Sequence, residues 1–356
     1  MLESYSDYYS DYLIVQNYLA TATGLAKLME GHISHDQVSR FLRRQKFDSK
    51  DLWLYAKKEL EHISQEEQGV LIVDDTILEK PYTKENEINT WHYDHAKQRH
   101  VKGINMVSCM LNQDNINLPI GYEIVKKDSE YRDKKTNKLK KRSQETKNQK
   151  FRRLLDHARR NATKYDYVLA DSWFGSKENM DYIHYNLGKK FILGLKSNRL
   201  ICTEKEHGAK KAGYLKLKNA DIVADRPYSV RLKGIDFPLT LVKKVFKNGN
   251  GSIGILYLIS NDLTLDSDAL YKLYQRRWRI EEYHRSIKQN ASITKSPCWE
   301  IRTQRNHIHM ALIAYCKLEG LKIKRKLNHY TLRNMLFIKA AMAAWAELKN
   351  LRKEVV

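Results

Sequence analysis

Acidic side chains that interrupt apolar runs are the residues of this 356-residue sequence most able to do chemistry. Asp74 and Asp75 follow the run VLIV, and Asp171 interrupts the run YVLADSW. A carboxylate buried without a partner is costly, so acids in such places indicate hydrogen bonds or a bound cation. Mg²⁺ prefers oxygen ligands, and two such ions can stabilise the attacking and the leaving oxygen at a phosphorus atom. These positions therefore fit phosphodiester cleavage.

A further acid, Glu281, lies in a segment with a regular pattern. Tyr274, Arg277, Glu281 and Lys288 have the spacing Y-(2)-R-(3)-E-(6)-K. Residues three or four apart share one face of a helix, so this face would present a phenol, a guanidinium, a carboxylate and an ammonium together. The two cations and the phenol can grip DNA phosphates beside the acid. The alternative is a solvated helix laced with salt bridges, which explains the charges but not the tyrosine on the same stripe.

The order of the predicted elements places the first acids at strand ends. Three strand-like runs come first, and the earliest of them ends at Asp74 and Asp75. They are followed by a helix, a strand that ends at Asp171, a second helix and a strand at 189–196. This order predicts an α/β fold with an RNase H-like catalytic core, in which side chains at strand ends emerge into a cleft.

Changes in residue composition and hydrophobic pattern along the chain predict its domains. We expect a helical, DNA-binding domain at 1–66, a catalytic core at 67–196 that resumes at 262–356, and a β-rich insertion at 197–261. In the first domain, Ser34 would cap a basic amphipathic helix after a turn at Gly31, as in small DNA-binding heads. The basic side chains of this helix include Arg40, Arg43 and Arg44. A helical bundle with a solvated basic face is the alternative.

Two other segments have a distinctive composition. Residues 132–150 contain nine Lys or Arg, which predicts a flexible, loop-like segment that contacts the DNA backbone or is merely solvated. Residues 335–348, MLFIKAAMAAWAEL, indicate helix packing rather than a cofactor site.

The overall charge points to a polyanionic partner. The sequence has 64 Lys and Arg against 42 Asp and Glu, a formal net charge of +22. Nucleic acid is the commonest such partner, while a ribosome-associated protein, a membrane-surface protein or a basic background proteome is the alternative. Four cysteines without a C-x-x-C pair indicate a reducing compartment. Since neither a signal peptide nor an apolar run of about 18 residues is present, we expect a cytoplasmic protein with no membrane contact.

These motifs resemble those of bacterial insertion-sequence transposases of the DDE class, in the group named after insertion-sequence family four. The Y-(2)-R-(3)-E-(6)-K signature matches without a gap. VDDT at 73–76, YVLADSWF at 167–174 and KKFILGLKSNR at 189–199 resemble strands of the same group. The resemblance covers about residues 67–300, and the insertion typical of the group fits the long separation between Asp171 and Glu281.

The resemblance implies an active site. Asp75, Asp171 and Glu281 would be both catalytic and metal-binding, holding two Mg²⁺ ions for which Mn²⁺ can substitute. Asp74 is the alternative to Asp75, which we prefer because an acid directly before Thr76 matches the pattern of the group better.

The resemblance also implies a reaction. One cut at the transposon's terminal inverted repeat would free a 3′-OH, which then attacks the opposite strand to give a hairpin, or target DNA. Tyr274, Arg277 and Lys288 would contact the transposon end, and Trp299 or Trp173 would hold an extruded base. A homodimer would pair two ends. A nuclease or resolvase without strand transfer and a non-catalytic DNA-binding relative are the alternatives.

Overall fold

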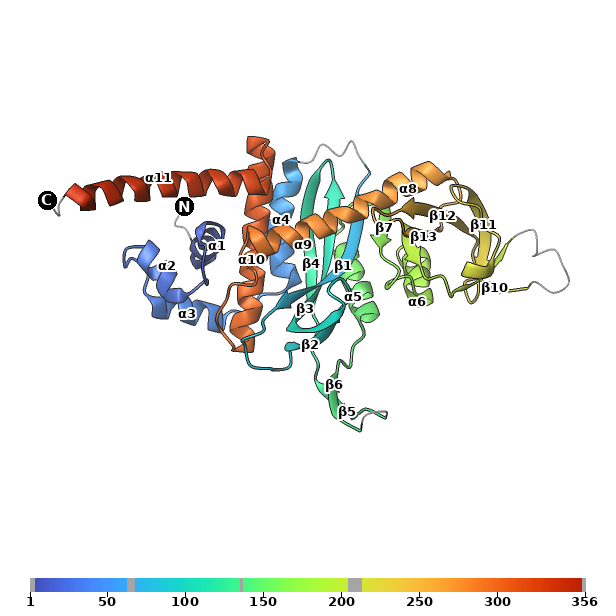
Figure 1. Ribbon diagram of the computed structural model, residues 1–356, viewed down its shortest axis with the longest axis horizontal. Helices are drawn as coiled ribbons and strands as arrows, with labels where there is room; N and C mark the ends of the chain where they lie inside the picture. The colour runs from blue at the N-terminus through green and yellow to red at the C-terminus, as the bar shows by residue number, and fades with distance from the viewer. Residues whose placement is uncertain (1–3, 63–67, 135–136, 204–212, 354–356) are drawn as a thin grey trace.

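The computed structural model describes residues 4–62, 68–134, 137–203 and 213–353. Helices from both ends of the chain flank a large mixed β-sheet (Figure 1). The α-helices are α1 (Tyr5–Val15), α2 (Ala22–Leu28), α3 (His35–Arg44), α4 (Ser49–Ala56), α5 (Lys147–Arg160), α6 (Lys177–Asp181), α8 (Ser267–Gln275), α9 (Arg279–Gln289), α10 (Ile301–Arg325) and α11 (His329–Lys353). Shorter helical turns are η1 (Lys57–His62), η2 (Tyr182–Asn186), η3 (Leu217–Asn219) and η4 (Arg276–Trp278).

The centre of the sheet has the strand order β4–β3–β1–β7–β8. Strands β1, β3 and β4 are antiparallel to one another, whereas β7 and β8 run parallel to β1. This gives the mixed α/β fold that the sequence predicts. The strands are β1 (Val70–Glu79), β2 (Asn89–Asp94), β3 (Arg99–Gln113), β4 (Ile116–Ile124), β5 (Ser129–Arg132), β6 (Leu139–Arg142), β7 (Tyr167–Ala170), β8 (Lys190–Leu195), β9 (Leu200–Thr203), β10 (Leu215–Lys216), β11 (Pro227–Leu232), β12 (Leu239–Lys247) and β13 (Ile253–Ser260).

Helices cover both faces of this central sheet, and successive residues of β1 alternate between the two layers. Val70 and Ile72 belong to a core shared with α9, α10 and the N-terminal helices. Leu71 and Val73 belong to a second core shared with α5 and α6. A strand points successive side chains to opposite faces, so β1 separates the two cores.

The strand β1 is longer than the sequence predicts. It does not end at Asp74 and Asp75 but continues to Glu79, because β3 pairs with it along its whole length. Only the pairing with β7 stops earlier, at Val73. The acids therefore lie within a strand, and they point to opposite faces of the sheet.

The segment of the signature is also not one continuous helix. Tyr274 lies on α8, Arg277 lies in the 3₁₀ turn η4, and Glu281 and Lys288 lie on α9. A tighter turn within a helix often marks a functional hinge or a strained sequence. Here it precedes the glutamate by one turn.

The N-terminal helices pack against the C-terminal helix α10 rather than standing apart. Residues of α1, α3 and α4 share one core with α10. Within this group, α2, a turn with Gly31 at φ 84° and α3 follow one another. Ser34 caps α3 through a reciprocal hydrogen-bond pair with Gln37, so the predicted cap is confirmed.

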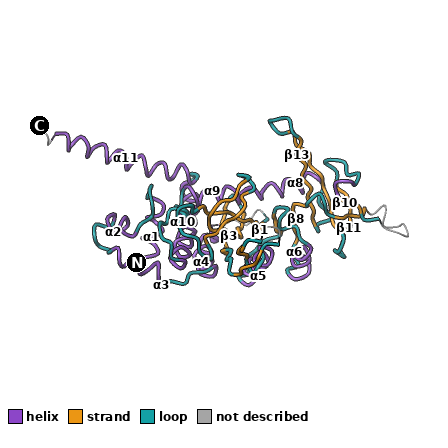
Figure 2. Tube along the Cα trace, turned by 60° about the horizontal axis from the view of Figure 1, so that its bottom comes forward, coloured by secondary structure: helices purple, strands orange, loops and turns teal. Residues whose placement is uncertain are grey.

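The β-rich segment at 197–261 extends the central sheet. Its strands β9–β13 continue from β8 in the order β13–β12–β11–β9–β10. In Figures 1 and 2 they form the end of the molecule opposite to α11.

The basic segment is more ordered than predicted. Residues 129–142 contain the antiparallel hairpin β5–β6, and α5 begins at Lys147, so the expectation of a loop is wrong. In Figure 1 the hairpin projects from the body of the protein, and nearly all its side chains are exposed.

The C-terminal helix α11 includes the segment 335–348 and is buried only at its start. Only His329 and Leu332 are buried, and α11 extends away from the other helices in Figures 1 and 2. Its apolar side chains from Met335 onward are largely exposed. Within the ranges that the structure covers, no helix is both long and apolar enough to cross a membrane.

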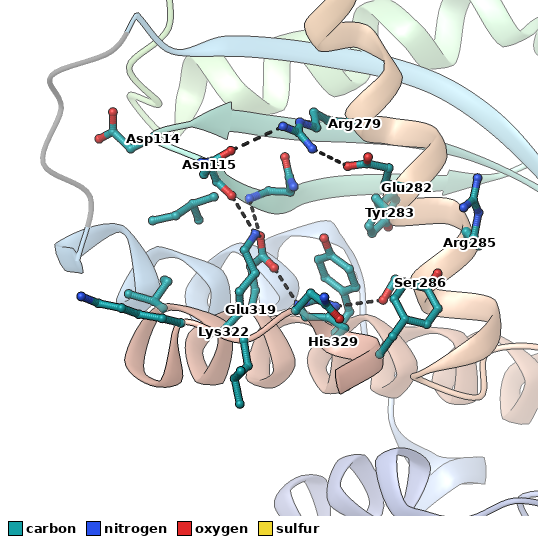
Figure 3. Close-up of a pocket in the computed structure, with 18 residues that line it drawn as sticks. Asp114, Asn115, Arg279, Glu282, Tyr283, Arg285, Ser286, Glu319, Lys322 and His329 are labelled. Carbon is teal, nitrogen blue, oxygen red and sulfur yellow. Dashed lines mark hydrogen bonds and ion pairs between the residues drawn. The ribbon is translucent and has the colours of Figure 1, made fainter. Parts of the chain in front are cut away.

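A buried carboxylate ties α10 to the start of α11 and to the start of β4 (Figure 3). Glu319 is 1% exposed and accepts hydrogen bonds from the backbone N–H of Asn117 (2.6 Å) and from Lys322 Nζ (2.7 Å). Its other oxygen lies 2.7 Å from His329 Nε2, and His329 Nδ1 is 2.9 Å from Ser286 Oγ on α9. The same network thus reaches the helix that carries Glu281.

Replacing this carboxylate should destabilise the fold. Burial alone would raise the pKa of Glu319, but the bonds from His329 and Lys322 hold it below its ordinary value. We expect Glu319→Gln to lower the free energy of unfolding at neutral pH by about 2 to 4 kcal/mol, as measured by urea denaturation. Glu347→Gln on exposed α11 is the control and should change it by less than about 0.5 kcal/mol.

The loss of unfolding free energy in Glu319→Gln should also depend on pH in a defined direction. A carboxyl whose pKa is lower in the folded state contributes stability above its unfolded pKa, about 4.3 for Glu, and loses it as the pH falls through the folded pKa. The difference between wild type and Glu319→Gln should therefore shrink on acidification. A difference that stayed constant down to pH 3 would contradict this account.

Candidate active site

The candidate site forms where two parallel strands separate. The register between β1 and β7 ends with the pair Val73 and Ala170. The next residue on each strand is an acid, Asp74 on β1 and Asp171 after β7. Since neighbouring strands lie about 4.8 Å apart, this register brings the two backbone positions together although 97 residues separate them (171 − 74).

The two adjacent acids of β1 lie on different faces. Asp74 shares its face with Ile72 and Thr76, which is the side covered by α9, whereas Asp75 shares its face with Val73 and α5. Lys288 of α9 donates to Thr76 Oγ1 at 2.7 Å, which marks the same side. The helix that carries Glu281 therefore lies over the Asp74 face.

The electrostatics of Asp74 and Asp171 indicate a crowded acidic centre. Burial, followed by repulsion from Asp171 and Asp75, raises the pKa of Asp74 to about 7. Burial also raises the pKa of Asp171, whose Oδ1 accepts a hydrogen bond from the backbone N–H of Trp173 at 2.9 Å. Like charges in a poorly solvated place resist ionisation, and a cation would relieve this cost.

Arg277 supplies positive charge that acts on both Asp74 and Asp171. Its Nη2 donates to Glu281 Oε1 at 2.8 Å, and its guanidinium lies 5.7 Å from the ring centre of Tyr274. Burial opposes the charge of Arg277, but Tyr274, Glu281 and Asp74 together hold its pKa above the ordinary value. The signature residues are therefore brought together with Asp74 despite the break between α8 and α9.

Tyr274 and Lys288 lie on either side of Glu281. Tyr274 is 7% exposed, and burial is the main reason that its pKa rises to about 12. Burial lowers the pKa of Lys288. His284, one turn after Glu281, is buried, and its Nε2 has no hydrogen-bond partner among the described residues. The spacing in the sequence placed this histidine on the same stripe.

Asp75 has partners that sequence reasoning missed. Its Oδ2 accepts hydrogen bonds from Lys147 Nζ and from Asn105 Nδ2, both at 2.7 Å. Lys147 is the first residue of α5, and Asn105 lies on β3. No local motif marks either residue, because only the pairing of β1 with β3 and the packing of α5 bring them to Asp75.

The two candidate tryptophans lie at different places. Trp173 follows Asp171, is 48% exposed and has Lys147 Nζ and Lys196 Nζ at 5.5 Å and 4.9 Å from its ring centre. Trp299 is 68% exposed in the connection before α10, where it lines a groove of about 550 Å³ with Tyr82 and Lys80. Either ring is accessible, and only Trp173 adjoins an acid of the site.

The basic residues of α3 are not part of this cluster. Arg40, Arg43 and Arg44 are exposed on a helix that packs with α2 and α10. In Figure 1 this helix lies away from the strands that carry the acids. Any role of these arginines is separate from that of the acidic centre.

The acids suit a hard divalent cation by their chemistry. Asp74, Asp171 and Glu281 offer only oxygen donors, as Mg²⁺ prefers, and a cation would offset the burial and the repulsion that raise the pKa of Asp74. In the described parts of the chain, however, no three acidic, histidine or cysteine side chains are grouped closely enough to hold an ion as they stand. Arg277 bonds Glu281 instead, so an ion would have to compete with this guanidinium.

Comparison with known proteins gives a family and distant likenesses among solved structures. The family model described as "DDE superfamily endonuclease" matches residues 9–219, well over half of the chain. Among solved structures, the chain is similar to "Mos1 transposase paired-end complex with left transposon end", with 14% identity and a TM-score of 0.19. That match covers 48% of this chain and spans about half (53%) of the other chain. No curated protein matches the chain.

The family match spans the central sheet up to η3, and with it Asp74, Asp75 and Asp171. Glu281 lies beyond the matched residues, so its assignment to the site rests on the spacing of the signature and on its contact with Arg277. Nucleases of this superfamily act with divalent metal ions, and their core is RNase H-like, in keeping with the strand order β4–β3–β1–β7–β8. The chain belongs to the DDE superfamily endonucleases.

Proposed function

We propose that the chain is the transposase of a bacterial insertion sequence, of the group named after insertion-sequence family four, and that it cuts DNA at transposon ends and joins the freed 3′-OH to target DNA. The observation that carries the proposal is the meeting of Asp74 and Asp171 beneath the helix of Glu281, with Arg277 bonded to the glutamate. An acidic centre in a chain of net charge +22 is what cleavage of a polyanion requires. A cytoplasmic location with access to DNA is part of the same proposal.

Within this proposal, Asp74, Asp171 and Glu281 hold two Mg²⁺ ions, for which Mn²⁺ substitutes. The ions supply Lewis acidity at the scissile phosphate and activate the attacking oxygen. Asp74 is the first metal ligand in this proposal. It replaces Asp75, which the sequence favoured because it directly precedes Thr76. This choice is supported by the side of the sheet on which Asp74 lies and by the engagement of Asp75 with Lys147 and Asn105.

The chain's own cations position the DNA. Arg277 leaves Glu281 to bind a phosphate oxygen, for which the planar guanidinium is suited. Tyr274 and Lys288 flank it along the same face and bind the backbone on either side. Trp173 and Trp299 offer exposed rings for unpaired bases, and Arg40, Arg43 and Arg44 contact the duplex further along.

Removing the glutamate should abolish cleavage without unfolding the protein. With Mg²⁺ and DNA that bears the terminal inverted repeats of the element, Glu281→Gln should nick at least about 10³-fold more slowly than wild type. Glu282→Gln is a matched control, because the neighbouring acid pairs with Arg279 instead. Equal activity of Glu281→Gln and wild type would rule out the catalytic assignment.

The two aspartates of β1 should differ in their effects. Asp74→Asn should lower the cleavage rate at least about 10³-fold, because it removes a negatively charged metal ligand on the α9 face of the sheet. Asp75→Asn keeps the shape of the residue and can still accept from Lys147 and Asn105, so its loss should stay within about tenfold. Single-turnover cleavage of the two variants decides between them. The opposite ranking would restore Asp75 as the first metal ligand.

The hairpin β5–β6 is a further DNA contact in this proposal. A two-stranded hairpin is at best marginally stable by itself, and this one has no buried face against the body of the protein. Its described residues carry more bases than acids, and its base is next to Lys147 at the site. Two-stranded ribbons of this kind fit a DNA groove. The basic side chains are Arg132, Lys134, Lys138, Lys140, Lys141 and Arg142.

Neutralising the hairpin should weaken binding in a salt-dependent way. Each phosphate contact adds about 0.9 to the slope of log K against log salt concentration, so Lys138→Ala/Lys141→Ala/Arg142→Ala should lower the slope by about 2 to 3. Fluorescence anisotropy with duplex DNA measures this. Lys216→Ala/Lys218→Ala/Lys233→Ala removes the same charge from exposed positions of the β-rich end. A similar loss in both triple variants would show that the hairpin has no special role.

A nuclease or resolvase without strand transfer would use the same acids, so the products separate it from a transposase. Wild type incubated with cut transposon ends and supercoiled target DNA should give joined products in addition to cut ones. Cutting alone would reduce the proposal to a nuclease, and DNA binding without cutting would reduce it to a non-catalytic relative. Joining two ends also calls for two copies of the chain, so a homodimer belongs to the proposal.

A further inference from the structure

A recess of about 730 Å³ opens beside α9, between the start of β4 and the connection from α10 to α11 (Figure 3). Arg279, Glu282 and Ser286 of α9 line the recess, and their spacing of three and four residues places them on one stripe. Glu281 lies on a different stripe of the same helix. Pockets for small organic molecules have volumes of about 300 to 1,000 Å³, so the recess is large enough for one.

Three buried polar groups line the recess. The carboxylate of Glu319 lies 2.7 Å from His329 Nε2, and His329 Nδ1 lies 2.9 Å from Ser286 Oγ. Each of the three residues is less than a tenth exposed. A purely apolar ligand, such as a fatty acyl chain, would displace water from this side without returning hydrogen bonds, so its binding is disfavoured.

Aromatic and aliphatic side chains form other walls of the recess. The rings of Tyr283 and Tyr315 are buried and meet edge to face at 4.9 Å, and Tyr330 at the start of α11 is 42% exposed. Ile323 packs on Ile116 in the same lining. An inorganic anion would contact little of these walls and would fill a small part of the volume, whereas a flat aromatic group fits both.

Two cations of the lining have no partner in the described chain. Arg285 of α9 and Lys326 after α10 are exposed, and neither forms a hydrogen bond or an ion pair with a described residue. The other two cations of the lining, Arg279 and Lys322, are already paired with acids. Guanidinium and ammonium groups are the donors that proteins use for phosphate, so the free pair calls for an anionic ligand.

We infer that the recess binds a nucleotide, with its phosphates on Arg285 and Lys326 and its base against Tyr330 and Ile323. The two cations require an anion, and the volume exceeds that of inorganic phosphate. The mixed walls suit a base, since every base has a flat face that stacks on aromatic rings. A free nucleotide and the terminal nucleotide of a DNA strand share this chemistry. A paired base inside a duplex offers neither face, because both are stacked on its neighbours.

The bound nucleotide connects α9 to the start of α11. Arg285 lies on α9 four residues after Glu281, whereas Lys326 and Tyr330 flank the connection between α10 and α11. A ligand that contacts both elements favours the arrangement in which both are in place. The nucleotide site is independent of the proposed function, and only an effect of the nucleotide on DNA cleavage rests on that function.

Isothermal titration calorimetry of the full chain with ADP tests the inference. EDTA removes divalent ions, so that no metal-bound nucleotide gathers at the acids of the candidate site. Salt at about 0.15 M screens the general attraction of a chain of net charge +22. Wild type should bind one ADP per chain, and ADP at about 100 times its Kd should raise Tm by about 3 °C.

Two matched double variants test the role of the cations. Arg285→Ala/Lys326→Ala should weaken ADP binding at least about tenfold, because two charge-assisted hydrogen bonds are lost. Lys324→Ala/Arg325→Ala removes one lysine and one arginine from exposed positions of α10 outside the lining and should bind ADP as wild type does. Circular dichroism checks that both variants keep their helices.

Recognition of the base is tested by a third variant. Tyr330→Ala removes a ring at an exposed position and leaves both cations in place. It should weaken ADP binding at least about fivefold, because the base loses its aromatic contact, and should change binding of inorganic pyrophosphate less than about twofold.

Displacement of a fluorescent ADP analogue distinguishes the two sources of the nucleotide. Unlabelled ADP and a single-stranded oligonucleotide with a 5′-phosphate are added separately to the complex of wild type with the analogue. Displacement by ADP alone assigns the recess to a free nucleotide. Displacement by the oligonucleotide at a lower concentration than ADP assigns it to a strand end, and either result supports the inference.

Three results would overturn the inference. They are no binding of ADP to wild type, equal weakening in both double variants, and pyrophosphate binding as tight as that of ADP, which would leave only a general anion site. The proposed function fails separately. A chain that binds ADP and does not cut DNA keeps the inference and loses the proposed function, and a chain that cuts DNA without binding ADP does the reverse.

Discussion

The short parallel pairing of β1 with β7 is the constraint on which the candidate site depends. It stops at Val73 and Ala170, so the strands separate where their acids begin. Beyond this point β1 is held by β3 alone, which leaves Asp74 without a neighbour on one side. A longer β7 would fill this opening with backbone, and a shorter one would leave Asp171 unfixed. The register thus decides which two carboxylates meet, and burial, followed by repulsion from Asp171 and Asp75, raises the pKa of Asp74 to about 7.

The fold tolerates this repulsion because it supplies a cation from each face of the sheet. Arg277 approaches from the α9 side and bonds Glu281, and Lys147 approaches from the α5 side and bonds Asp75. Removing an acid of such a centre often stabilises a protein, since local strain at functional sites is offset by the rest of the fold. The arrangement therefore reads as one kept for binding a cation and a phosphate rather than for stability.

Sequence patterns predicted the succession of strands and helices because each element has its own hydrophobic period. They also predicted which residues of the signature lie together, since Tyr274, Arg277 and Glu281 are neighbours within a few turns. What they missed depends on contacts between distant segments. β1 continues past Asp75 only because β3 extends beside it, and the bond from Lys147 needs α5 to begin at that place. The orientation of Asp74 and Asp75 follows from the same pairing, so the local sequence could not rank them.

The exposure of α11 has a physical cause of a different kind. An apolar helical period predicts that a helix is buried, but it does not say by what. Among the described residues, α11 packs mainly on α1 and α10, and its hydrogen bonds to α9 and to the end of α1 come from His329 and Arg333 near its start. The apolar face beyond Leu332 lies past the reach of the core that contains Ile280 and Ile287. The contacts of Ser286, His329 and Glu319 therefore hold only the base of α11, and they link that base to α9, the helix that carries Glu281.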